Sequence, residues 1–143
     1  MSQQFKYLTS DLAVASQLSV ADVQAAKDAG FNTIINNRPD NEEPGQPDNG
    51  QIARAASDLG LDFHYLPVIS GQLLDSNIED FKQLLPELRR PVLMFCRSGT
   101  RCTHLWALSQ ANELATEQIC ASASAAGYDL GSLMVRIKQQ QKQ

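Results

Sequence analysis

The chain has few side chains that hold metals, and it lacks the long runs that mark membrane or nucleic-acid binding. It contains two histidines and three cysteines in 143 residues. His64 and His104 lie far apart and make no ligand spacing with the cysteines, so we predict neither a metal site nor a cofactor. No stretch is apolar and long enough to cross a bilayer. The net charge of -4 and the lack of a basic run argue against nucleic acid or an anionic membrane as a partner.

The two ends of the sequence are polar. Residues 1–6, Met-Ser-Gln-Gln-Phe-Lys, lack the apolar core of a signal peptide. We therefore expect a cytoplasmic protein, where reducing conditions keep cysteines as thiols. The tail from Lys138 to Gln143 has no apolar face, and we expect it to be frayed.

Strand-like and helix-like patterns alternate along the chain. Its 43% hydrophobic content is enough for one sizeable core. The alternation predicts a single α/β domain over residues 1–143, with a mostly parallel central sheet flanked by helices on both faces. The patterns place strands at 12–15, 33–37, 63–66 and 92–95, and helices at 19–29, 51–59, 77–88 and, two or three in number, after the loop that follows residue 95.

The most informative segment is residues 91–103, Pro-Val-Leu-Met-Phe-Cys-Arg-Ser-Gly-Thr-Arg-Cys-Thr. An apolar strand leads into a tight loop, and the loop leads into an amphipathic helix that carries Leu105, Trp106 and Leu108. In such a layout the backbone N–H groups of the loop and of the first helical turn point into one concavity. Such concavities bind anions.

Cys96 lies at the mouth of this concavity and is the predicted nucleophile. The helix N-terminus, Arg97 and Arg101 favour the thiolate, so we expect a depressed pKa. The alternative is a small core cysteine at a strand end with two solvated arginines. Gly99 supplies the φ freedom that the turn needs. The predicted anion-binding loop consists of Arg97, Ser98, Gly99, Thr100 and Cys102 beside the catalytic Cys96 and Arg101.

Two chemistries commonly use a cysteine, a glycine and an arginine packed in this way. Protein tyrosine phosphatases hydrolyse phosphoesters through a phosphocysteine, and rhodaneses transfer sulfur through a cysteine persulfide. The phosphatase signature has five residues between cysteine and arginine. Here four residues separate Cys96 from Arg101, and Cys102 stands where that arginine would be. A shorter loop has fewer N–H groups around a tetrahedral phosphate, so the loop length favours sulfur.

Three passages resemble the bacterial family called beta-lactamase hydrolase-like protein, phosphatase-like domain. They are residues 8–19, residues 34–47 with Asn-Asn-Arg-Pro-Asp at 36–40, and residues 96–101. The resemblance implies a tyrosine-phosphatase-like α/β fold, and members of the family have been regarded as phosphatases or as sulfurtransferases.

One position departs from the phosphatase pattern. Tyrosine phosphatases have a hydroxyl residue directly after the arginine, and that residue assists hydrolysis of the phosphocysteine. Here the position is Cys102, and Thr103 could replace the hydroxyl only if the helix began with a different rotation. The departure argues against efficient phosphatase turnover. Cys102 itself either packs under the loop or resolves an oxidised Cys96, and packing is the preferred interpretation.

A phosphatase also needs an acid that protonates the leaving oxygen. Asp40 and Asp48 lie in the long polar loop that begins at Arg38, and Asp75 precedes a helix. For Asp75 we expect that it, or Ser76, caps the helix. Asp40 is the predicted acid, with turn formation as an equally weighted alternative.

Two further residues could contact substrate. Arg38 follows a strand, where ligand sites of α/β sheets gather, but pairing with Asp40, Glu42 or Glu43 is the preferred alternative. His104 lies on the first helical turn after the loop, with a solvated helix position as its preferred alternative.

The leading hypothesis is sulfur transfer, in which Cys96 takes sulfur from a sulfane-sulfur donor and passes it to a thiol acceptor. The first alternative is hydrolysis of a phosphomonoester, with Arg101 binding the phosphoryl oxygens and Asp40 as acid. The second alternative is an anion-binding or redox-sensing module with little catalysis. All three require a small anionic ligand.

Overall fold

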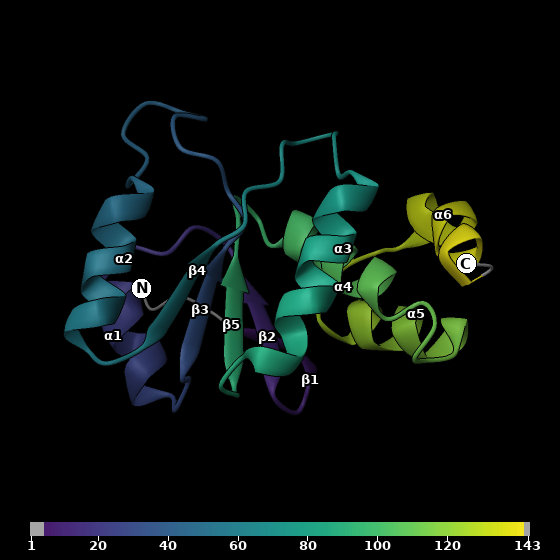
Figure 1. The fold of residues 1–143 in the computed structure, drawn as a ribbon, viewed down its shortest axis with the longest axis horizontal. Helices are drawn as coiled ribbons and strands as arrows, with labels where there is room; N and C mark the ends of the chain where they lie inside the picture. Colours follow the sequence, from purple (N-terminus) through teal and green to yellow (C-terminus); the bar gives the residue numbers. More distant parts are fainter. Residues whose placement is uncertain (1–4, 142–143) are drawn as a thin grey trace.

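A five-stranded sheet forms the centre of the computed structural model, which describes residues 5–141 (Figure 1). Its strand order is β1–β2–β5–β3–β4, and only the edge pair β1–β2 is antiparallel. The mostly parallel sheet is therefore confirmed. The strands are β1 (Lys6–Thr9), β2 (Leu12–Ala15), β3 (Thr33–Asn36), β4 (Asp62–Tyr65) and β5 (Val92–Phe95).

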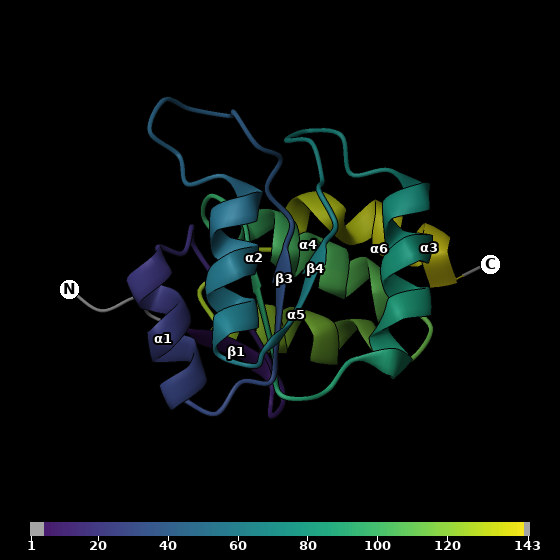
Figure 2. The same ribbon diagram turned by 60° about the vertical axis from the view of Figure 1, so that its left-hand side comes forward.

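Helices cover both faces of this sheet (Figures 1 and 2). On one face lie α1 (Val20–Asp28) and α2 (Asn49–Asp58). On the other lie α3 (Asp75–Leu84), α4 (Thr100–Ser109), α5 (Thr116–Ala125) and α6 (Met134–Gln141). Short 3-10 turns follow α3 at Leu85–Glu87 and precede α6 at Gly131–Leu133.

The central strand β5 is buried on both faces, as its continuous apolar run predicts. Val92 and Met94 pack into the core beneath α3 and α4, while Leu93 and Phe95 pack into the core beneath α1 and α2. This alternation follows from the two-residue period of a strand. Because both faces are fixed by packing, the residue that follows β5, Cys96, has a well-defined position.

The first two helix starts follow from polar side chains. Ser19 caps α1 as predicted, and its hydroxyl accepts the backbone N–H of Asp22. The helix expected from Gln51 begins two residues earlier, because the carboxylate of Asp48 accepts the N–H of Gln51 and so caps α2.

The predicted cap of α3 is wrong. The helix begins at Asp75 and its capping position is Leu74, whose backbone N–H is accepted by the side chain of Asn77. Asp75 lies in the first turn, where its carboxylate pairs with Arg136 at 3.0 Å. This ion pair joins α3 to a helix far away in the sequence, so it cannot be predicted from the residues around Asp75.

The expectation of a frayed tail is wrong for residues 138–141, which belong to α6. Gln140 is buried, its backbone carbonyl accepts the side chain of Asn112, and the side chain of Gln141 donates to Thr116. Residues 1–4 and 142–143, on which parts of the terminal expectations fall, lie outside the described residues. None of the helices between residues 5 and 141 combines the length and apolar character that crossing a bilayer requires.

The carboxyl ends of the four parallel strands meet at one edge of the sheet. The segment between β3 and α2 and the segment between β4 and α3 both rise above this edge (Figures 1 and 2). Cys96 follows β5 at the same edge. Ligand sites of open α/β sheets form at this location.

Candidate active site

The reactive loop spans residues 96–101 between β5 and α4. The backbone N–H of Cys96 donates to the carbonyl of Ala15 at 3.3 Å, which continues the pairing of β5 with β2 by one residue. Gly99 adopts a positive φ of 89° and is the N-terminal cap of α4. The loop therefore turns directly into a helix, as predicted, and its amide groups gather around the Cys96 sulfur.

Hydrogen-bond donors surround the Cys96 sulfur on the protein side. The N–H of Gly99 lies 3.1 Å from Sγ. The thiol of Cys102 and the backbone N–H groups of Cys102 and Ser98 also favour the charged form of this sulfur. Together they lower the pKa of Cys96 to about 5, with the Cys102 thiol as the largest cause, against the opposing effect of burial. Cys96 is therefore a thiolate at neutral pH, and a better nucleophile than a free cysteine.

Cys102 is the protonated partner of this pair. It is fully buried in the first turn of α4, and burial together with the neighbouring Cys96 charge raises the pKa of its thiol. Packing under the loop, the preferred interpretation, is therefore confirmed. Cys102 also lowers the pKa of Cys96, an effect that was not predicted from the sequence. Thr103 does not replace the missing hydroxyl, because its Oγ1 donates to the carbonyl of Gly99 at 2.9 Å.

Two small residues of the loop, Ser98 and Thr100, bind each other at its surface. Ser98 Oγ donates to Thr100 Oγ1 at 3.0 Å, and the N–H of Thr100 lies 3.4 Å from Ser98 Oγ. Both residues are exposed, as is Arg97, whose side chain is 67% exposed and pairs with Glu43. Arg97 thus points to the rim, and its guanidinium is not among the causes that lower the pKa of Cys96.

Tyr128 supports the loop from the segment between α5 and α6. Its hydroxyl donates to the carbonyl of Ser98 at 2.9 Å, and it is the nearest neighbour that a side chain at Gly99 would meet. Burial and the charge near Cys102 and Cys96 raise the pKa of Tyr128 to about 12, so it remains a donor. This contact could not be predicted from local sequence, because Tyr128 and Ser98 lie 30 positions apart.

A network of ion pairs joins Arg101 to the long loop between β3 and α2. Both oxygens of Glu42 bind the guanidinium of Arg101, at 2.7 and 2.8 Å, and one of them also accepts Arg38 Nε at 2.8 Å. Arg101 donates further to the carbonyl of Val68. The hydrogen bonds from Arg101 and Arg38 lower the pKa of Glu42, which keeps it ionised. From the sequence, Glu42 is expected only as a partner of Arg38.

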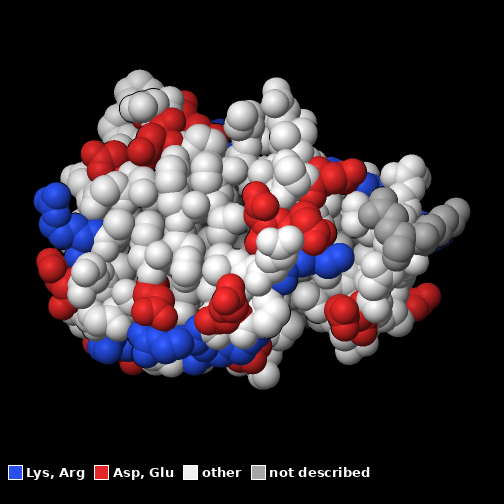
Figure 3. Space-filling model, in the orientation of Figure 1, with Lys and Arg blue, Asp and Glu red and all other residues white. Residues whose placement is uncertain are grey.

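Arg38 is the centre of the buried half of this network. Its side chain is 2% exposed, and its three nitrogens donate to Glu42, Glu43 and Gln17. The predicted pairing with the acidic loop residues is present. Glu43 also lies 3.4 Å from Arg97, so that two carboxylates and two guanidinium groups line one hollow beside the reactive loop. Figure 3 shows acidic side chains gathered over the loop above α2.

The structure gives Asp40 and His104 definite surroundings. One oxygen of Asp40 accepts the N–H of Asn49 at 2.7 Å, and its own N–H donates to the hydroxyl of Tyr65. These contacts are those of the turn alternative, and the role of Asp40 as an acid stays a prediction.

His104 is half-buried rather than solvated, and burial lowers the pKa of its imidazole. Its contact with substrate also stays a prediction.

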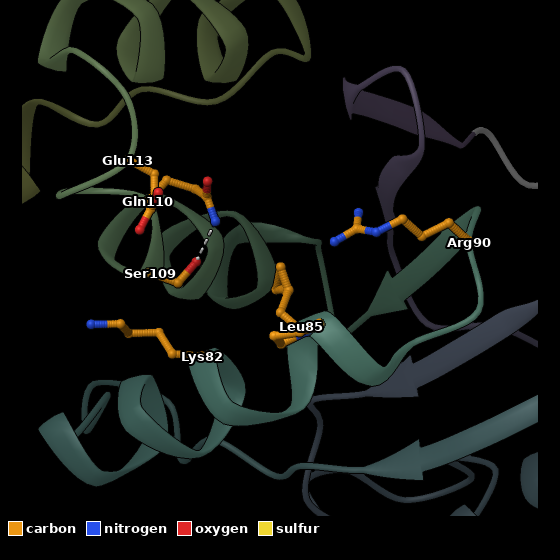
Figure 4. Close-up of a pocket in the computed structure, with 7 residues that line it drawn as sticks. Lys82, Leu85, Arg90, Ser109, Gln110 and Glu113 are labelled. Atoms are coloured by element: carbon orange, nitrogen blue, oxygen red, sulfur yellow. Dashed lines mark hydrogen bonds between the residues drawn. The ribbon is translucent and has the colours of Figure 1, made fainter.

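A second hollow lies at the other end of α4 (Figure 4). Ser109, Gln110 and Glu113 border it from the carboxyl end of α4 and beyond, opposite Lys82 and Leu85. The reactive loop is at the amino end of the same helix. This hollow is thus separate from Cys96. Among residues 5–141 no group of histidine, cysteine or carboxylate side chains is arranged to hold a metal ion.

Comparisons with known proteins converge on one family and one fold. The model of the family "Beta-lactamase hydrolase-like protein, phosphatase-like domain" matches residues 4–113. A beta-lactamase hydrolase-like protein of Agrobacterium fabrum is 40% identical over 100 residues, which are 70% of this chain and 23% of that protein. The chain spans only 23% to 30% of the length of the curated relatives it matches.

Solved structures agree on the fold. The crystal structure of a candidate phosphatase from Neisseria meningitidis Z2491 is 36% identical, with a TM-score of 0.85 over 94% of this chain and 96% of that one. Kinase associated phosphatase, with its catalytic cysteine replaced by serine, has a TM-score of 0.76 over 99% and 97% at 14% identity, a likeness of fold alone. The fold is tyrosine-phosphatase-like, as the resemblance implied.

Proposed function

Because the chain belongs to the family of beta-lactamase hydrolase-like proteins, phosphatase-like domain, we propose that it is a cysteine-dependent hydrolase of phosphomonoesters. The observation that carries the proposal is the position of Cys96 at the amino end of α4, where the Gly99 N–H contacts its sulfur and the Arg101 guanidinium belongs to the same loop. The lowered pKa of Cys96, about 5, agrees with this arrangement. This arrangement supplies a nucleophile and cationic donors for a phosphoryl group.

The reaction proceeds in two displacements. Cys96 Sγ attacks phosphorus, an S–P bond forms, and the ester P–O bond breaks as the leaving oxygen takes a proton. Water then attacks the phosphocysteine, the S–P bond breaks, and inorganic phosphate leaves with the Cys96 thiolate restored. Arg101 and the loop amides hold the phosphoryl oxygens, whose charge is spread in the transition state. Asp40 is the proposed proton donor to the leaving oxygen.

Sulfur transfer is the second candidate, and the length of the loop favours it. Only four residues separate Cys96 from Arg101, and the amides of the loop converge on a single sulfur atom. In this reaction Cys96 attacks the outer sulfur of a sulfane-sulfur donor such as thiosulfate, and sulfite leaves. An acceptor thiolate then removes the outer sulfur of the persulfide and restores the Cys96 thiolate.

Intact mass spectrometry beside a phosphate-release assay separates the two reactions. The protein and its Cys96→Ser variant are incubated with an aryl phosphate and, separately, with thiosulfate. We expect phosphate release from the aryl ester and none with Cys96→Ser. A gain of one sulfur only when Cys96 is present, without phosphate release, would replace the phosphatase proposal with sulfur transfer.

A further inference from the structure

The guanidinium of Arg101 has one edge held by protein and one edge open. An arginine carries five N–H donors in a planar fork. Two of the five point to the Glu42 carboxylate and one to the Val68 carbonyl, all from the Nη1 and Nη2 atoms. The remaining donors are the Nε hydrogen and one Nη2 hydrogen, for which the part of the chain that the structure describes offers no hydrogen-bond partner. These two lie on the same edge, which is the edge that binds two oxygens at once.

Glu42 is itself fixed from behind. Its Oε1 accepts a hydrogen bond from Arg38 Nε, and the Arg38 side chain is 2% exposed. The negative charge of Glu42 is therefore paired with a buried positive charge. The backbone N–H of Glu42 donates to the side chain of Gln46, which in turn donates to the carbonyl of Pro39. The segment that carries Glu42 is therefore held by hydrogen bonds of its own, and the Glu42 carboxylate extends from it to the Arg101 side chain.

The same network returns to the reactive loop. Arg38 Nη1 donates to the side chain of Gln17 at 3.1 Å, and the backbone N–H of Gln17 donates to the carbonyl of Arg97 at 3.3 Å. The path from Arg101 through Glu42 and Arg38 thus begins and ends on the loop that carries Cys96. A carboxylate that only balances surface charge would not be expected to bind a buried guanidinium as well, as Glu42 binds that of Arg38.

On the basis of the proposed phosphatase function, we propose that Glu42 is a positioning residue: it grips the Nη1–Nη2 end of Arg101 so that the open Nε–Nη2 edge binds two oxygens of the phosphoryl group. The carboxylate and the phosphoryl group then occupy different edges of one guanidinium and do not compete. Misplacement of a bound group by about 1 Å can lower a rate about 100-fold, so the grip bears on catalysis directly.

The test compares Glu42→Gln with Glu43→Gln. Both variants remove one charge from adjacent residues that bind Arg38, but only Glu42 contacts Arg101. We expect Glu42→Gln to lower kcat/KM for an aryl phosphate by about 10- to 100-fold, and Glu43→Gln to lower it by less than about 3-fold. In an Arg101→Ala background the Glu42→Gln change should have no further effect, because Glu42 acts through Arg101.

Binding gives a readout that does not depend on turnover. Inorganic phosphate should protect Cys96 of the wild type from iodoacetamide, and at least 10-fold more phosphate should be needed with Glu42→Gln. Tighter phosphate binding by Glu42→Gln would overturn the proposal and make Glu42 a competitor of the anion. An equal loss of activity in the Arg101→Ala background would overturn it as well.

The two proposals fail in different ways. If the wild type hydrolyses no aryl phosphate, but phosphate protects its Cys96 from iodoacetamide better than it protects Cys96 of Glu42→Gln, the phosphatase proposal fails and the positioning role stands. If it hydrolyses the ester and Glu42→Gln changes neither kcat/KM nor protection, the positioning role fails alone. Thermal melts confirm that each variant is folded at the assay temperature, and Glu42→Asp, which keeps the charge on a shorter side chain, replaces Glu42→Gln if that variant is not. For Glu42→Asp the proposal predicts the same direction of change.

Discussion

Cys96 in the reactive loop and Cys102 in the first turn of α4 have pKa values shifted in opposite directions. Donors around Cys96 lower its pKa to about 5, while burial and the Cys96 charge raise the pKa of Cys102. Cys102 occupies the position at which tyrosine phosphatases have a hydroxyl, and its thiol is the largest cause of the low pKa of Cys96. The departure from the phosphatase pattern therefore preserves a donor at this position, although a thiol donates more weakly than a hydroxyl.

Replacing Cys102 should raise the pKa of Cys96. Cys102→Ala removes the largest cause of the low value and keeps the backbone donors. A hydrogen bond to a charged group contributes about 1.5–3 kcal/mol, so we expect a rise of about 1 to 2 pH units. The pH dependence of Cys96 alkylation by iodoacetamide measures it. Cys120→Ala is the control, since Cys120 contacts Met134 and should leave the midpoint unchanged. An unshifted midpoint in Cys102→Ala would show that the amides alone hold the thiolate.

The residues of the reactive loop could be predicted because they are adjacent in the sequence. Cys96 at a strand end, Gly99 with positive φ and Arg101 near the thiolate all follow from local pattern. Glu42 as the partner of Arg101 could not be predicted, since 59 positions separate them. The preference for sulfur transfer rests on the length of the loop and on Cys102 at the position of the phosphatase hydroxyl. The family and fold comparisons favour the phosphatase alternative, and the sulfur chemistry stays a prediction.

At the scale of elements, the sequence predicted which segments are strands and helices better than where they begin. The central strands and α1 follow from apolar periodicity and from a capping serine. The edge strand β1 was missed because only Leu8 of its four residues is buried, so no alternation is visible. The start of α3 was misplaced, and α6 was missed at its end, because both depend on contacts with segments far away in the sequence.

The junction of the reactive loop with α4 depends on Gly99 and Tyr128. Gly99→Ala would place a side chain at positive φ, which costs about 1–3 kcal/mol, and would push it against the Tyr128 hydroxyl. We expect loss of most activity and a lower melting temperature. In a Tyr128→Phe background the nearest obstructing atom is absent, so Gly99→Ala should cost less stability there. A double-mutant cycle of urea unfolding measures the difference, and additive costs would contradict the contact.

At the scale of the whole molecule, charges are balanced locally rather than spread. The amino edge of the sheet carries the pairs Arg89–Asp62 and Arg90–Asp11, and the carboxyl edge carries the network around Glu42. The exposed ion pairs at the amino edge contribute little to stability. The Cys96 thiolate is a buried charge whose ionisation differs between the folded and the unfolded chain.

The folded protein should become more stable as pH rises from about 5 toward 9. Between these values the unfolded chain holds a proton on Cys96, whose ordinary pKa is 9.0, and the folded chain does not. Stability therefore increases with pH, by at most about 1.4 kcal/mol per pH unit, and is lost as pH falls through 5. Urea unfolding at pH 6, 7 and 8 measures the slope. Cys96→Ser should flatten it, and an unchanged slope in that variant would assign the effect to other groups.

Tyr128 lies beyond residue 113, where the match to the family model ends, yet its hydroxyl holds the carbonyl of Ser98. The helical layer after α4 is therefore part of the machinery that shapes the reactive loop, and not an accessory to it. A minimal fragment for grafting or domain exchange has to extend at least through this tyrosine. A fragment that ends at residue 113 would contain the nucleophile Cys96 but would lack the Tyr128 hydroxyl that binds the carbonyl of Ser98 in the reactive loop.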